Sequence, residues 1–285
     1  MKWRGRRGSQ NIEDRRRRGG GGGGGGARIG GLGAVVVVLL GLFFGVDTSF
    51  LVGQNGPVAS SSGSGEVTPE DDQAAQFVSV ALRDTETIWA ELFRTQVGRE
   101  YRPATLVLFK GATQSPCGGA NGASGPFYCP ADRKAYLDTD FFVTMARQMG
   151  AGGDFAAAYV VAHEVAHHVQ NELGILGQAN QLRARVSQRE SNEISVRLEL
   201  QADCYSGIWA RLAQDKLGTV EPGDLGEALN AAKQVGDDTI MLNAGKRPNP
   251  HTFTHGTSAQ RQRWFARGYE AARMDACDTF GTNQL

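Results

Sequence analysis

The sequence predicts a mainly helical α+β fold with a small β-sheet, preceded by one transmembrane helix. Residues 29–46 are eighteen consecutive residues without a charge, about the length that crosses a bilayer as a helix. Strand-like segments are confined to 105–138, and helical periodicity occupies most of the remaining chain. A group of strands followed by a run of helices is typical of α+β domains.

The charges of the chain are divided unevenly along it. The 285 residues contain 30 basic and 30 acidic side chains. Residues 1–32 alone hold nine Lys/Arg against Glu13 and Asp14, so the rest of the chain is acidic. A basic tail of this kind indicates either membrane orientation or nucleic-acid binding, and the apolar segment that follows favours orientation. We therefore expect no nucleic-acid partner.

The alternative for residues 29–46 is a cleaved signal peptide. The charged region before them is too long for one, and no clear small-x-small cleavage site follows closely. We predict an uncleaved single-pass anchor in the cell membrane. By the positive-inside tendency, the Gly/Arg-rich tail 1–28 is then cytoplasmic and everything after Val46 is extracytoplasmic.

Residues 47–67 are rich in Ser and Gly and are predicted to be a flexible linker. The globular domain is expected to span 68–285. It begins with Thr68 as helix N-cap and Pro69 at the first helical position. This helix should run to Gln96, and its inner face should consist of Phe77, Ala81, Ile88, Trp89 and Leu92.

The next part of the domain should contain the sheet. Strands are predicted at 105–109, 127–128 and 134–138, because these segments are short and rich in β-branched, aromatic or leucine residues. Residues 135–137 are expected to bind an extended peptide by strand addition. Further helices are predicted at 141–149, 193–212, 224–242 and 258–274, with a polar stretch at 178–190.

The most informative segment is AAYVVAHEVAHHVQ, which should lie on a helix from Asp154 to about Gly174. It contains His163 and His167 four residues apart, so both imidazoles lie on one helix face and can bind one metal ion. Glu164 projects about 100° away from His163. There it can take a proton from an attacking water without binding the ion itself.

A catalytic zinc needs a third protein ligand. Glu199 is the candidate, and Asp203 lies four residues later on the same helix face, where it could hydrogen-bond a ligand imidazole. The alternative for this pair is a solvated acidic face. Glu172 and Glu193 are the other carboxylates considered as ligands.

All four cysteines lie beyond the predicted anchor, where an oxidising compartment would favour disulfides. Four cysteines allow three connectivities. Cys117 and Cys129 flank one flexible loop, so their pairing is the simplest choice and leaves Cys204 with Cys277. The alternative is that Cys204 is a buried free thiol.

Several separated blocks resemble the bacterial putative neutral zinc metallopeptidase family. They are HEVAHHVQ, ELQADCYSG, Phe253 to Arg261 with the following RWF, YCPAD and YLD. The resemblance covers residues 68–280. It implies a gluzincin-like (zincin-like) catalytic domain, a membrane-anchored N-terminus and a Zn²⁺ cofactor. It also implies Glu199 as third metal ligand and Asp203 as support for His163.

Peptide hydrolysis also needs a donor for the oxyanion that forms on the carbonyl. His255 is predicted as this donor, with Tyr205 or Arg263 behind it, while Glu164 acts as general base. Each has an alternative role: His255 could cap the last helix, Tyr205 could be core, and Arg263 could pair with a surface acid. His168 points to another helix face and is expected either to pack in the core or to support a metal ligand.

The sequence therefore predicts a membrane-anchored zinc endopeptidase that acts on a peptide or protein substrate. The alternative is a catalytically silent, metal-stabilised module that binds envelope proteins. Glu164 argues against this module, because a structural zinc site has no use for a general base.

Overall fold

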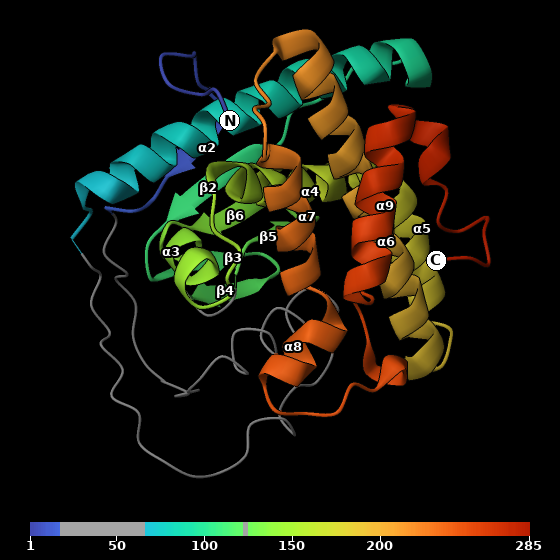
Figure 1. Ribbon diagram of the computed structural model, residues 1–285. Coiled ribbons are helices and arrows are strands. Elements are labelled where there is room, and N and C mark those ends of the chain that lie inside the picture. The colour runs from blue at the N-terminus through green and yellow to red at the C-terminus, as the bar shows by residue number, and fades with distance from the viewer. Residues whose placement is uncertain (18–65, 122–124) are drawn as a thin grey trace.

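The computed structural model describes residues 1–17, 66–121 and 125–285. The predicted α+β class is confirmed, since helices dominate and the sheets are small (Figure 1). The strands are β1 Ile12–Asp14, β2 Thr105–Phe109, β3 Ala112–Ser115, β4 Gly118–Asn121, β5 Phe127–Cys129 and β6 Lys134–Asp138. The α-helices are α2 Pro69–Leu92, α3 Asp140–Arg147, α4 Asp154–Glu172, α5 Ile175–Arg183, α6 Gln188–Leu212, α7 Asp224–Gln234, α8 Asp237–Asn243 and α9 Ser258–Ala271. Single turns follow α2 (η2, Phe93–Val97), α6 (η3, Ala213–Leu217) and α9 (η5, Met274–Cys277), and η4 (Pro250–Thr252) precedes α9.

The main sheet has the order β1-β2-β6-β5, with β1, β2 and β6 parallel and β5 antiparallel. The predicted strands are confirmed within one residue at each end. The prediction that residues 135–137 add a peptide strand is wrong, because β6 is an inner strand that pairs with β2 on one side and, over residues 134–136, with β5 on the other. The edge strands of this sheet are β1 and β5.

The two faces of the sheet pack against different partners, because successive side chains of a strand point to opposite faces. Leu106, Leu108 and Leu137 join the main core together with residues of α2 and α4. Val107 and Tyr136 point to the other face, where they form a second core with the start of β5 and part of β4. The sheet therefore presents one face to the helices that build the site.

Residues 1–17 belong to the domain, so the predicted boundary at residue 68 is wrong. Strand β1 pairs with β2 in the core sheet. The Trp3 ring packs edge-on against Phe77 at 5.5 Å between centroids, and Arg6 forms two hydrogen bonds to the buried Asp84. The high charge of this segment suggested a solvent-exposed tail, but its apolar residues Met1 and Trp3 belong to the core.

This packing bears on the predicted membrane topology. Arg16 donates to the backbone carbonyl of Asp71, and Arg17 lies 3.6 Å from Asp72. Both acids are in the first turn of α2. Residues 1–17 therefore pack as part of the domain that contains α2 and the sheet. Residues 1–17 are therefore not a separate tail, and the location of the domain stays a prediction.

The predicted anchor at 29–46, the end of the tail and the linker up to residue 65 lie outside the described residues. Within the described ranges, none of the helices combines the length and the apolar character needed to cross a membrane.

Helix α2 begins as predicted. Thr68 is its N-cap and forms a capping box with Asp71, and Pro69 is the first helical residue. All five residues expected on its inner face are buried. Figure 1 shows this helix crossing the molecule next to the sheet.

The C-terminal helices differ from the prediction in two places. The polar stretch after α4 contains α5, and α6 begins at Gln188 because Ser187 and Glu190 form a capping box. The single helix predicted at 224–242 is broken at Gly236 into α7 and α8. A Cβ at Gly236 would lie 2.4 Å from the backbone nitrogen of Ser258, so the chain can pass this point only as glycine.

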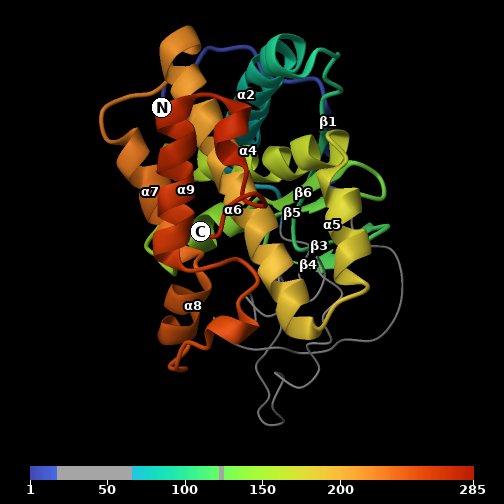
Figure 2. The ribbon, with the colours of Figure 1, turned by 90° about the vertical axis from the view of Figure 1, so that its right-hand side faces the viewer.

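Helices α6 and α9 pack side by side at backbone distance (Figure 2). A Cβ at Gly207 would lie 2.0 Å from the Phe265 carbonyl oxygen, and one at Gly268 would lie 1.8 Å from that of Cys204. Only glycine permits such a close approach. The contact brings side chains of α9 into reach of the acids on α6.

Both predicted disulfides are confirmed. Cys117 is bonded to Cys129, and Cys204 is bonded to Cys277. The alternative of a free thiol at Cys204 is therefore wrong. The second bond ties the segment after α9 to α6 and fastens the same close helix pair.

Candidate metal centre

Helix α4 carries the histidine pair, and it is buried along nearly its whole length. The predicted start and end are confirmed within two residues. Its N-cap is Gly153, and Asp154 lies in the first turn. Asp154 accepts a 2.8 Å hydrogen bond from the N-terminal ammonium of Met1. Burial and this hydrogen bond fix α4, and with it the two histidines, in the core.

Two imidazoles and one carboxylate converge at the centre of the molecule. Nε2 of His163 lies 3.1 Å from Oε2 of Glu199, and Nε2 of His167 lies 3.3 Å from Oε1 of Glu199. One ligand atom from each residue lies within 4.8 Å of the others, and all three residues are buried. Two nitrogen donors and one carboxylate, with room for a fourth position, are the ligand set of catalytic zinc sites. The residues present therefore fit a zinc ion.

The other carboxylates considered as ligands lie elsewhere. Glu172, at the end of α4, pairs with Arg102 at 3.1 Å and with Arg133 at 3.4 Å. Glu193 is exposed and pairs with Arg189 one turn away. The structure brings only Glu199 to the two histidines among the described acids.

The charges of the three donors favour a cation between them. Burial by itself would lower the pKa of His163, but the carboxylates of Asp203 and Glu199 outweigh it and raise this pKa to about 9. Burial would raise the pKa of Glu199, but His167 and His163 hold it well below its usual range. The carboxylates thus favour a positive charge at the imidazoles.

Asp203 lies behind His163, as predicted. Its Oδ1 is 3.0 Å from Nδ1 of His163 and accepts a hydrogen bond from the Tyr159 hydroxyl at 2.5 Å. Arg261 on α9 completes the group: its Nε and Nη2 donate to the two oxygens of Asp203 at 2.8 and 2.9 Å. Burial would raise the pKa of Asp203, but Arg261 and His163 lower it. The carboxylate thus stays charged and fixes the ring of His163.

The sequence prediction assigned no role to Arg261 or Tyr159. A signal for Arg261 was present, because it lies three and four residues before Trp264 and Phe265 and so shares the apolar face of α9. A charged residue on the buried face of a helix requires a buried partner. Nothing in the sequence named Asp203 as that partner.

His255 lies near the donors and is held by an acid that the sequence analysis missed. Oδ2 of Asp237 accepts the backbone N–H groups of Thr254, His255 and Gly256 at 2.7 to 3.0 Å. Its Oδ1 lies 3.2 Å from Nδ1 of His255. Burial would lower the pKa of His255, but Asp237 raises it. The capping alternative is wrong, because Thr257 is the N-cap of α9.

The two residues predicted behind His255 lie elsewhere. Tyr205 is in the core, 5.5 Å from the Trp89 ring. Arg263 is exposed and donates to the backbone carbonyl of Leu285 at 2.7 Å. The packing role expected for His168 is confirmed, because its ring nitrogens contact a tyrosine hydroxyl and a backbone carbonyl away from the metal donors.

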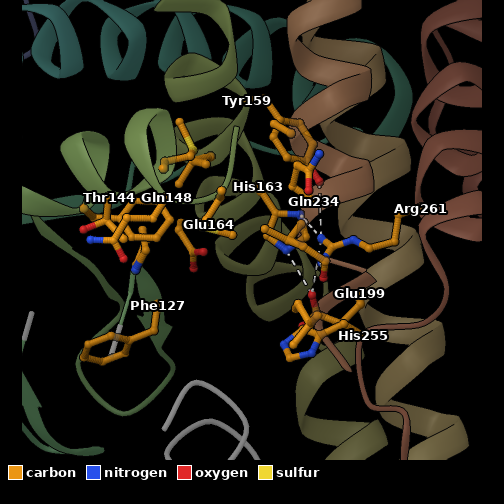
Figure 3. Close-up of a pocket in the computed structure, with 18 of the residues that line it drawn as sticks. Phe127, Thr144, Gln148, Tyr159, His163, Glu164, Glu199, Gln234, His255 and Arg261 are labelled. Carbon is orange, nitrogen blue, oxygen red and sulfur yellow. Dashed lines mark hydrogen bonds and ion pairs between the residues drawn. The ribbon is translucent and has the colours of Figure 1, made fainter. Parts of the chain in front are cut away.

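Glu164 faces a cavity of about 570 Å³ that also exposes the three donors, His255 and Arg261 (Figure 3). Its Oε2 is buried and has no hydrogen-bond partner among the residues that the structure describes. Burial raises the pKa of Glu164, while the two histidines lower it less. An unpartnered, basic carboxylate oxygen beside a three-donor site is available to accept a proton from a ligand.

Comparison with known proteins identifies the family of the chain. The model of the family described as putative neutral zinc metallopeptidase matches residues 1–280. The chain belongs to this family. The match includes residues 1–17, in agreement with their packing in the domain.

Curated proteins from other bacteria are similar to this chain in sequence. An Escherichia coli K12 relative, named uncharacterized protein YpfJ, is 46% identical over 288 residues, covering 99% of each chain. Uncharacterized protein Rv2575 of Mycobacterium tuberculosis H37Rv is 47% identical over 195 residues, or 65% of each chain. No solved structure matches the chain.

Proposed function

We propose that the protein is a zinc-dependent endopeptidase with His163, His167 and Glu199 as metal ligands and Glu164 as general base. The observation that carries this proposal is the unpartnered oxygen of Glu164 in a substrate-sized cavity, next to the three converging donors. When bound, zinc would lower the pKa of a coordinated water towards 7 and polarise the substrate carbonyl.

The residues around the metal donors carry out the proton transfer, orient a ligand and stabilise the oxyanion. Glu164 accepts the proton of the attacking water and passes it to the leaving amine. Asp203 holds the ring of His163 in one orientation through Nδ1, so that Nε2 faces the metal position. His255, oriented by Asp237, donates a hydrogen bond to the oxyanion that develops on the carbonyl.

An extended peptide is the substrate form that the sheet supports. Strand β5 is an edge strand and runs antiparallel to β6. Phe127, its first residue, lines the cavity that contains Glu164. A peptide paired with the outer edge of β5 would therefore run past the general base, with backbone hydrogen bonds that do not depend on sequence.

The proposed location is extracytoplasmic, and two disulfides support it because such bonds are rare in reducing compartments. If residues 29–46 attach the protein to a membrane, the chain must leave the domain after Arg17 and rejoin it before Glu66. Arg17 contacts the first turn of α2, and this helix begins shortly after Glu66. Both flanks of the proposed attachment thus lie on one side of the domain.

The decisive experiment compares Glu164→Gln with the wild type and with Glu172→Gln, a control on the same helix outside the site. Glutamine keeps the shape of the side chain but cannot accept the proton. We expect Glu164→Gln to retain one zinc per chain by elemental analysis. Hydrolysis of a peptide library should fall by roughly 100- to 10,000-fold, while the control keeps its activity. Unchanged hydrolysis in Glu164→Gln would disprove the general-base assignment. A wild type that binds zinc but cleaves nothing would favour the catalytically silent binding module.

A further inference from the structure

A chain of buried side-chain amides begins at Nδ1 of His167. This nitrogen lies 2.8 Å from Oε1 of Gln170, which is one turn later on α4. Nε2 of Gln170 donates to the backbone carbonyl of Leu198 at 2.7 Å and to Oε1 of Gln201 at 3.1 Å, both on α6. Nε2 of Gln201 donates in turn to the backbone carbonyl of Cys277 at 3.0 Å. Gln170 and Gln201 are both buried, and together they are called the amide relay below.

Two backbone carbonyls set the direction of every hydrogen bond in the amide relay. A carbonyl oxygen can only accept, so the NH2 group of Gln170 must face Leu198. For the same reason, the NH2 group of Gln201 must face Cys277. Oε1 of Gln201 then accepts the second N–H of Gln170. Both N–H groups of Gln170 are used in this way, which leaves its Oε1 to face His167.

This acceptor fixes the tautomer of His167. Because Oε1 of Gln170 can only accept, the proton of a neutral ring must lie on Nδ1. Nε2 then keeps its free electron pair, and this is the nitrogen that lies 3.3 Å from Glu199 in the candidate metal centre. Metal-binding imidazoles depend on such an acceptor behind the ring for their orientation and their basicity.

The far end of the amide relay is held by a disulfide. Cys277 is the last residue of η5 and is bonded to Cys204, which lies one turn after Gln201 on α6. The same segment is attached to α6 a second time, where the hydroxyl of Thr279 donates to the carbonyl of Arg197 at 2.8 Å. The disulfide is therefore one of two attachments that fix the Cys277 carbonyl.

We infer that the amide relay positions His167 for metal binding and links the Cys204–Cys277 disulfide to the metal affinity of the site. Gln170 and Gln201 are positioning residues, because neither lines the cavity but both act on the ring of a metal donor. The inference rests on the proposed role of His167 as a metal ligand, not on peptide hydrolysis.

The link to the disulfide follows from the direction of the hydrogen bonds. Without the disulfide, the Cys277 carbonyl can move away, and the NH2 group of Gln201 loses its acceptor. Both amides can then turn over. With Gln170 turned, an N–H group would face Nδ1 of His167 and favour the tautomer whose proton is on Nε2. That tautomer cannot bind a metal through Nε2.

The first test measures the zinc affinity of the full chain by competition with a chelator. Gln170→Met keeps the length of the side chain but removes its donors and its acceptor, and it should weaken zinc binding roughly 10- to 100-fold. Gln201→Met should weaken it by a smaller factor, because Gln170 keeps its bond to a backbone carbonyl. Asn171→Leu is the matched control on α4, since its amide donates to the Tyr128 hydroxyl, which bonds His168 rather than a metal donor. It should keep the zinc affinity of the wild type.

The second test removes the disulfide. Replacing Cys204 and Cys277 by serine should weaken zinc binding roughly 2- to 30-fold. In the Gln201→Met background the same replacement should have little further effect, because the amide relay is already broken. Replacing Cys117 and Cys129 by serine is the control, since it removes the other disulfide and should leave zinc affinity unchanged. If the first cysteine variant does not fold, Gln201→Met breaks the relay with both disulfides intact.

A nuclear magnetic resonance measurement separates positioning from a general loss of stability. In the zinc-loaded wild type with isotopically labelled histidines, Nδ1 of His167 should carry a proton that exchanges slowly with water. This proton should exchange faster in Gln170→Met and should be unchanged in Asn171→Leu.

The outcomes for the relay and for the peptidase are distinct. Unchanged zinc affinity or unchanged proton exchange in Gln170→Met would overturn the inference and leave the peptidase function in place. An equal loss of zinc affinity in Asn171→Leu would also overturn it. If affinity and exchange change as expected but the wild type cleaves no peptide, the peptidase function fails and the amide relay stands.

Discussion

The buried ion pair between Asp203 and Arg261 holds the metal site together, and a double-mutant cycle can measure it. The variants are Asp203→Asn, Arg261→Met and the two combined. The pair is bidentate, with donor–acceptor distances of 2.8 and 2.9 Å, and both side chains are almost completely buried. Arg261 also lies 3.8 Å from Glu199, so its charge offsets two carboxylates.

The expected magnitudes follow from this geometry. Two unit charges about 4 Å apart attract by about 4 kcal/mol at an effective dielectric constant of about 20. Removal of one partner of a buried pair usually costs about 3–5 kcal/mol, because the other charge is left unpaired. Each single variant should therefore lose about 3–5 kcal/mol of unfolding free energy. The double variant should lose less than the sum by about 2–3 kcal/mol, since neither charge is left alone.

Urea unfolding of the full chain at pH 7, followed by tryptophan fluorescence, measures these differences. A competition titration with a zinc chelator should show zinc affinity lowered roughly 10- to 100-fold in Asp203→Asn, because His163 loses its orienting acceptor. The matched control is Asp84→Asn, which breaks another bidentate pair, with Arg6, far from the donors. It should lose stability but keep zinc affinity. Strictly additive free energies, or an unchanged zinc affinity in Asp203→Asn, would refute the reasoning.

Three further predictions concern other parts of the structure. Asp237→Ala should leave zinc content unchanged but lower kcat at least roughly tenfold, because the histidine that it orients is lost as an oxyanion donor; steady-state kinetics and elemental analysis check this. Burial would raise the pKa of Asp71, but hydrogen bonds from Lys110 and two threonines lower it to about 2 from 3.8. Asp71 therefore adds stability in full above about pH 4 and loses it as the pH falls towards 2. Asp71→Asn should cost about 1–2 kcal/mol at pH 7 and less at pH 3, as urea unfolding at the two pH values would show. Replacing Cys204 and Cys277 by serine should cost about 4 kcal/mol, because their bond closes a loop with a sequence separation of 73 residues; equal urea midpoints would contradict this.

Local patterns in the sequence predicted local structure well. The capping signal at Thr68, the strand 105–109 and the histidine spacing of α4 all depend on residues within one or two turns of each other. Their outcomes match because hydrogen bonds and side-chain periodicity within one element are decided by neighbouring residues. The break at Gly236 was missed, because it depends on close approach to Ser258, which belongs to another helix.

The errors at the N-terminus and in the sheet have a different cause. The basic residues of 1–17 were read as a tail, although Trp3 and β1 have partners far along the chain. The order of strands in a sheet does not follow from their order along the chain. We therefore expected β6 to be an edge strand, whereas it lies between β2 and β5. Both outcomes depend on which surfaces meet after folding.

The sequence by itself predicted the candidate functional groups of this protein: two histidines and a glutamate on one helix, with a carboxylate pair on another. Their identities and spacing limit what they can bind, because a helix places residues four apart on one face. Only the tertiary structure decided which acid completes the metal site, and that Arg261 and Asp237 hold Asp203 and His255 in place. The pairs Asp203–Arg261 and Asp237–His255 join residues from different elements. Such contacts form only when the packing of whole helices, here α6 against α9 at their glycines, brings the side chains together.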